Sequence, residues 1–131
     1  MSNRRFELFL RFALPASHSL DEREERHRHD WKVQVGVTGP LEDGRIVSMP
    51  ALREALEPAV GALRGTFLNE NPCLSAEARA YPTCEYLALY FESAFTECLA
   101  KAQMPLALTR IEVAVDEIEG TESASAALTL V

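Results

Sequence analysis

Three histidines, the full complement of this 131-residue chain, fall within twelve consecutive residues. His27 and His29 are two positions apart and come just before Trp31, and His18 lies a short distance upstream. Imidazole is the commonest protein ligand of transition metals, and alternate residues of a strand project from one face about 7 Å apart. If the strand that contains Trp31 extends back to residue 27, His27 and His29 can reach one ion, and His18 can supply a third ligand.

Such a ligand set has a definite chemistry. Three neutral nitrogens leave one tetrahedral position open, which is typical of a catalytic zinc site rather than a closed structural one. A Zn²⁺ ion there would polarise a carbonyl or hydroxyl group, or would lower the pKa of bound water. Nickel, copper and iron also accept imidazole ligands. The alternative is that the His-Arg-His segment, which lies in a densely charged run, is a solvated loop.

Hydrophobic periodicity predicts the strands that would position these side chains. Apolar residues alternate with polar ones over residues 6–13 and again over residues 31–37, and each pattern indicates a strand with one buried face. Residues 111–115 predict a third strand, and the weakly patterned tail 123–131 predicts a fourth. The polar segment between the first two strands contains all three histidines.

Two helices are expected between the second and third strands. The first begins with Ser48 or Met49 as its N-cap, and Pro58 should kink it or end it early. Residues 64–81 are interpreted as a long connection, and the second helix starts near Thr83. The order of two strands, two helices and two strands predicts a single α+β domain over residues 1–131. Both helices would cover one face of a four-stranded antiparallel sheet.

Composition excludes several classes of function. The net charge of −7 argues against a nucleic-acid binder and against an anionic membrane surface. The apolar segment 6–14 is too short to span a membrane, and because Glu7 and Arg11 interrupt it, we expect a strand here rather than a secretory signal. Three cysteines with no CxxC spacing predict reduced thiols in a cytoplasmic protein. They are Cys73, Cys84 and Cys98.

The histidine pattern resembles the family of 6-pyruvoyl tetrahydropterin synthase and 6-carboxytetrahydropterin synthase. That family has a histidine after its first strand and a His-Gly-His segment followed by an aromatic residue at its second, similar to His18 and to residues 27–31 here. The resemblance continues in chain order over nearly the whole sequence. Its other segments are Gly44-Arg45-Ile46-Val47-Ser48-Met49, Leu63-Arg64-Gly65-Thr66-Phe67-Leu68-Asn69, Pro82-Thr83-Cys84-Glu85 and Val115-Asp116-Glu117.

The resemblance implies a fold and an assembly. It implies the tunnelling fold, in which subunits join their sheets into a barrel around a central tunnel, with active sites between subunits. A homo-oligomer, either a trimer or a hexamer, is therefore expected. The resemblance also implies that His18, His27 and His29 hold zinc and that a small-molecule pterin is the ligand.

The resemblance further assigns pterin-binding residues. Glu117 would anchor the pterin ring, and by parity it would extend the apolar face of the third strand, where a carboxylate is costly unless paired. Alternatively, the strand ends at Val115 and Glu117 is solvated. Thr83 and Glu85 would contact the ligand, although a threonine and a glutamate also suit a helix N-terminus for capping and charge.

The chain departs from the family where proton transfer is concerned. Family members use a cysteine upstream of the His-x-His segment and an Asp-His pair, but no cysteine precedes His27 here, and Arg64 and Gly65 occupy the pair's positions. Glu24, three residues before His27, is a candidate general base. It resembles a glutamate in relatives that cleave the dihydroneopterin side chain in an aldolase-like reaction. Alternatively, Glu24 is one of several solvated carboxylates in a charged run.

Three functions follow from these residues. The first is a zinc-dependent lyase or synthase acting on a dihydroneopterin-type substrate. The second is a non-catalytic relative that binds zinc and a pterin as a sensor or carrier. The third is a structural or assembly subunit that has lost both ligands.

Overall fold

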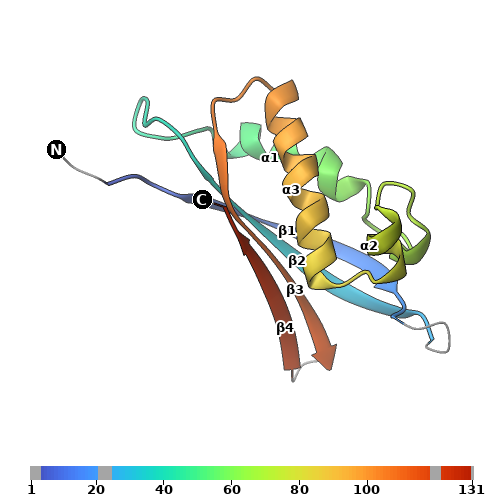
Figure 1. Ribbon diagram of the computed structural model, residues 1–131. Coiled ribbons are helices and arrows are strands. Elements are labelled where there is room, and N and C mark those ends of the chain that lie inside the picture. Colours follow the sequence, from blue (N-terminus) through green and yellow to red (C-terminus); the bar gives the residue numbers. More distant parts are fainter. Residues whose placement is uncertain (1–3, 21–24, 119–121, 131) are drawn as a thin grey trace.

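The computed structural model describes residues 4–20, 25–118 and 122–130, with only the backbone of residues 116–118, 122 and 123 (Figure 1). Four strands form one antiparallel sheet in the order β1-β2-β3-β4. All four predicted strands are confirmed, and each of the first three is longer than its hydrophobic pattern alone indicated. The strands are β1 (Leu8–His18), β2 (His27–Thr38), β3 (Ala107–Ile118) and β4 (Glu122–Thr129).

Two long helices, α1 (Met49–Gly61) and α3 (Cys84–Lys101), lie on one face of the sheet (Figure 1). The predicted α+β fold is confirmed. The segment 64–81, which we interpreted as a connection, also contains a 3₁₀ turn, η1 (Leu68–Glu70), and a short helix, α2 (Ala76–Ala80). No described helix is both long and apolar enough to cross a lipid bilayer.

The core forms where the helices meet the sheet. The even-numbered residues of β1 from Leu10 to His18 and the odd-numbered residues of β2 from Trp31 to Val37 are buried, so the strand periodicity identified the covered face correctly. The two helices present apolar stripes to this face, as expected for amphipathic helices. The largest fully buried side chains are Trp31, Phe91, Phe95, Leu14, Leu52, Leu56, Leu63, Leu68, Leu87, Ile111, Val33 and Val35.

The helix boundaries follow local chemistry. Ser48 is the N-cap of α1, and its hydroxyl accepts a hydrogen bond from the Ala51 N–H at 3.4 Å. Pro58 does not end α1 at once, because the helix continues to Gly61. The buried side chains of Ala59 and Val60 hold this last turn against the core and offset the loss of a backbone hydrogen bond at proline.

The sheet opens at the end that carries the histidines. The pairing of β2 with β3 runs from Lys32–Ala114 to Thr38–Ala107, whereas β2 itself extends back to His27 and β3 forward to Ile118. The β1–β2 and β3–β4 hairpins diverge toward this end (Figure 1). This divergence leaves room for a cavity between the hairpins.

Tyr90 connects the two long helices. Its hydroxyl donates a hydrogen bond of 2.8 Å to the carbonyl oxygen of Ala59 near the end of α1. Burial raises the pKa of Tyr90 from 10.0 to about 12, and the nearby Cys73 and Cys98 thiols add to this effect. The neutral phenol is therefore the form that the folded chain favours.

We expect this contact to make stability depend on alkaline pH. The folded chain holds the Tyr90 proton to a higher pH than the unfolded chain, so the contribution is fully present below pH 10 and is lost as pH rises toward 12. Tyr90→Phe should lower the free energy of unfolding at pH 8 by about 1 kcal/mol, and its deficit should shrink above pH 10. Urea titrations at several pH values check this, with the exposed Tyr81→Phe as control. A deficit that stays constant with pH would contradict it.

Candidate functional site

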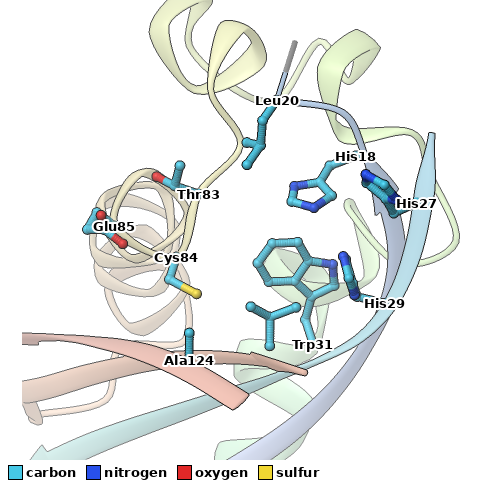
Figure 2. Close-up of a pocket in the computed structure, with 10 residues that line it drawn as sticks. His18, Leu20, His27, His29, Trp31, Thr83, Cys84, Glu85 and Ala124 are labelled. Carbon is cyan, nitrogen blue, oxygen red and sulfur yellow. The ribbon is translucent and has the colours of Figure 1, made fainter. Parts of the chain in front are cut away.

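The three histidines lie together at the open end of the sheet, as Figure 2 shows. His18 and His27 are paired across the β1–β2 ladder, and Ala16 is opposite His29. The ring centres are separated by 4.9 Å between His18 and His29, and by 6.0 Å for each of the other two pairs. Because β2 does extend back to residue 27, the alternation that buries Trp31 also places the imidazoles of His27 and His29 on the same face of the sheet.

His18 is held in a defined orientation. Its side chain is buried, and Nδ1 lies 2.9 Å from the carbonyl oxygen of Pro82. A carbonyl only accepts hydrogen bonds, so Nδ1 donates and Nε2 is the nitrogen left with a lone pair in the neutral ring. Metal-binding histidines commonly have such a partner on the other nitrogen, which fixes both tautomer and ring direction. The contact also joins β1 to the start of α3.

Trp31 packs against the imidazole rings of His18 and His29. It is fully buried, and its Nε1–H donates to the carbonyl oxygen of Ala16 at 3.2 Å. Its ring meets His18 and His29 edge-on, with centroid separations of 5.0 and 5.7 Å. The position of these imidazoles therefore depends on a rigid core residue.

The end of β1 is pinned from the opposite side by Asn69. Its side-chain oxygen accepts from the Ser19 N–H at 2.8 Å, and its side-chain nitrogen donates to the Ser19 carbonyl at 2.7 Å. This two-way contact fixes the residue that follows His18. Asn69 ends one of the segments that resemble the synthase family, but its contact with Ser19 could not be predicted from the sequence.

The histidine cluster can be compared with the geometry of a metal site. Zn–N bonds of about 2.0–2.1 Å at tetrahedral angles place imidazole ring centres about 5 Å apart, close to the observed 4.9–6.0 Å. As they stand, no three His, Cys, Asp or Glu side chains in the described part of the chain are arranged to hold a metal ion. The residue types and ring spacing fit a metal, and rotation of the half-buried His27 and His29 would be needed to complete the ligand set.

A cavity of about 390 Å³ separates the imidazoles from the start of α3 (Figure 2). This volume is within the range of about 300–1,000 Å³ that is usual for small-molecule sites. Two larger hollows, one between α1 and α3 and one between the α2 region and α3, do not contain the histidines. The described residues that line the cavity are His18, Leu20, His27, His29, Trp31, Thr83, Cys84, Glu85, Val115 and Ala124.

The start of α3 forms the wall opposite the imidazoles. Thr83 is the N-cap, and its hydroxyl accepts from the Tyr86 N–H at 3.3 Å, so the capping interpretation is confirmed. Glu85 lies exposed in the first turn, and both residues line the cavity. Their role in ligand binding stays a prediction. Cys84, to which the sequence assigned no role, lies between them in the same wall.

The side chains of the two carboxylates assigned from sequence, Glu24 and Glu117, lie outside the described part of the structure. Glu24 lies outside the described residues. The backbone of Glu117 belongs to β3, which continues to Ile118, so the strand does not end at Val115. The pairing of β3 with β4 shifts register between Asp116 and Ile118. Simple alternation therefore does not fix the direction of the Glu117 side chain, which is outside the described part.

Arg64 and Gly65 lie along the outer edge of β1. The Arg64 guanidinium donates to the carbonyl of Ala13 and forms an ion pair with Glu57. Gly65 has a φ of +74° and donates its N–H to the carbonyl of Pro15 at 2.6 Å. Neither residue lines the cavity. In this chain these two positions protect the edge of the sheet.

Comparison with protein families is decisive for classification. The sequence model of 6-pyruvoyl tetrahydropterin synthase matches residues 7–128. The chain belongs to the 6-pyruvoyl tetrahydropterin synthase family. Membership connects the chain with pterin-related lyases, and the histidine cavity lies within the matched region. Comparison with curated protein sequences found no match.

Solved structures of the synthase family share the fold of this chain. The Caenorhabditis elegans 6-pyruvoyl tetrahydropterin synthase has a TM-score of 0.69 at 12% identity, covering 94% of this chain and 95% of that one. The Plasmodium falciparum synthase has a TM-score of 0.62 at 17% identity, covering 98% and 100%. A Plasmodium vivax synthase, described as a catalytic residue mutant with glutamate replaced by alanine, has a TM-score of 0.63 at 15% identity, covering 98% and 100%. These likenesses establish the fold.

Proposed function

We propose that the chain is a zinc-dependent pterin lyase that acts on a dihydroneopterin-type substrate. One observation carries this proposal: the three imidazoles of a member of the synthase family gather at one cavity of suitable size, opposite the start of a helix. The cavity is lined by both polar and apolar groups, as expected for a flat heterocycle with a hydroxylated side chain.

Each residue would have a distinct task. His18, His27 and His29 would hold the metal, with Nε2 of His18 directed by the Pro82 contact. Zinc would supply polarisation of the substrate's side-chain oxygen atoms. Glu117 would accept hydrogen bonds from the pterin ring, as a bidentate carboxylate acceptor does.

Glu24 would move a proton as general base. Support comes from the P. vivax synthase, because the catalytic residue that is replaced by alanine in its variant is a glutamate. The position of Glu24 three residues before His27 would keep its carboxylate near the metal.

A homo-oligomer, trimeric or hexameric, is part of the proposal. Leu20 is 42% exposed while lining the cavity, so the cavity has an apolar border that a neighbouring subunit could cover. Light scattering would give the oligomer order. We also propose that the protein acts in the cytoplasm, with a pterin as its small-molecule partner.

A non-catalytic zinc- and pterin-binding relative is the second candidate. Arg64 and Gly65 favour it, because they occupy the positions of the family's Asp-His pair and are engaged with the edge of β1 instead. Glycine carries no acid or base, and arginine stays protonated. This candidate predicts pterin binding without chemical conversion.

Turnover and binding separate the two candidates. We expect zinc-loaded protein to convert dihydroneopterin or its triphosphate, Glu24→Gln to lose about 100-fold in kcat, and Glu117→Gln to lose pterin binding. Product would be followed by chromatography and binding by fluorescence. Binding without product from either substrate would reject the lyase and support the carrier. Absence of both binding and product would reject both candidates.

A further inference from the structure

Cys84 is the first residue of α3 and lies in the cavity wall that faces the imidazoles. Its side chain is only 7% exposed, and Figure 2 shows its sulfur directed toward the space between α3 and Trp31. The thiol thus lines the same cavity as the histidines, although it lies 55 or more positions from each of them in the sequence.

Cys84 occupies the N-terminus of a long helix. The backbone N–H groups at the start of an α-helix and the helix dipole both favour a negative charge there, and cysteines at helix N-termini are more reactive as a result. The helix is 18 residues long, with Thr83 as its cap, so its N-terminus is well formed. A thiol at this position can hold a proton or release it beside a ligand in the cavity.

The other two cysteines, and Arg64 and Gly65, lie away from the histidine cavity. Cys98 lies in the hollow between α1 and α3, and Cys73 is exposed near α2. Arg64 and Gly65 are at the outer edge of β1. Of the three cysteines, Cys84 is the one that lines the histidine cavity.

We propose that Cys84 is a second proton-transfer residue of this site, supplied by α3, in addition to the proposed general base Glu24. This inference rests on the proposed lyase function. As a thiolate, Sγ takes a proton from a side-chain O–H or C–H group of the pterin; the S–H bond forms as that bond breaks, and the electron pair stays on the substrate. As a thiol, Sγ returns the proton to the substrate or product, and the thiolate is restored.

Two variants test this assignment. Cys84→Ser and Cys84→Ala should each lower kcat with dihydroneopterin by about 100-fold or more, while dihydroneopterin affinity, read from quenching of Trp31 fluorescence, stays unchanged. Cys98→Ser is the matched control, because it removes a thiol outside the cavity, and it should keep full activity. Far-UV circular dichroism and melting temperature would show that the variants fold.

A labelling experiment gives a readout that does not depend on turnover. Dihydroneopterin should slow the alkylation of Cys84 by iodoacetamide in the wild-type protein and leave the alkylation of Cys73 unaffected, as measured by mass spectrometry. If the wild type converts dihydroneopterin and Cys84→Ala is equally active, the role of Cys84 is overturned and the lyase proposal stands. Ligand-independent alkylation would also overturn it. A wild type that makes no product rejects both proposals.

Discussion

Replacing His29 with alanine is expected to abolish turnover of dihydroneopterin and to weaken zinc binding by about 100-fold or more. Loss of a residue that only hydrogen-bonds to a metal ligand can already cost about 100-fold in metal affinity, and loss of a ligand itself should cost at least as much. His29 has the closest ring contact in the cluster, 4.9 Å from His18. Two remaining imidazoles hold an ion much less tightly than three. Zinc stoichiometry by elemental analysis and affinity by competition with a chelator would measure the loss.

Arg28→Ala is the appropriate control for His29→Ala. Arg28 lies between the two histidines of β2 but is exposed on the opposite face. Removing it takes away a side chain from the same segment without touching the cavity, so zinc content should be unchanged. Equal zinc binding by wild type and His29→Ala would remove the metal from the proposal, and with it the assignment of His18 and His27 as ligands.

Trp31→Ala should give the largest loss of stability among the changes at this site, about 3–5 kcal/mol in the free energy of unfolding. Trp31 is 1% exposed, and its removal leaves both a cavity and an Ala16 carbonyl without its donor. The same change removes the surface against which His18 and His29 pack. Zinc affinity should therefore fall even under conditions in which the variant is fully folded.

Urea unfolding followed by far-UV circular dichroism would measure the stability change, since Trp31 is the chain's single tryptophan and its fluorescence is lost. Lys32→Ala is a neighbouring control, because Lys32 is exposed on the other face of β2, and it should stay within about 0.5 kcal/mol of the wild type. A Trp31→Ala variant that binds zinc as tightly as the wild type would show that the tryptophan has no role in holding the rings.

The edge of β1 is covered by side-chain and backbone donors from the α1 region and the segment that follows it. Arg53 donates to the carbonyl of Arg11, Arg64 to that of Ala13, and Gly65 to that of Pro15. These contacts satisfy successive outward carbonyls of an edge strand, which otherwise invite pairing with another chain. Arg64 and Gly65 thus stabilise the edge of the sheet in this chain.

The strands, the two long helices and the common face of the histidines could be predicted from local sequence patterns alone. Alternation with a period of two is a local property, so Trp31 and Val33 were enough to fix which side of β2 is buried. Because β2 extends back to His27, the same alternation places His27 and His29 on the face of the sheet that carries Trp31. Thr83 as a helix cap was predictable for the same reason, because capping involves only neighbouring residues.

Which distant groups meet at the cavity could not be predicted from local patterns and is known from the packed fold. The tautomer of His18 depends on Pro82, 64 residues away, and Cys84 lines the same cavity as the imidazoles because α3 packs across the diverging hairpins. The role of Arg64 likewise depends on the edge of β1. Periodicity reports the face on which a side chain lies, whereas its partner on another element is set by how the elements pack, and no local pattern records that packing.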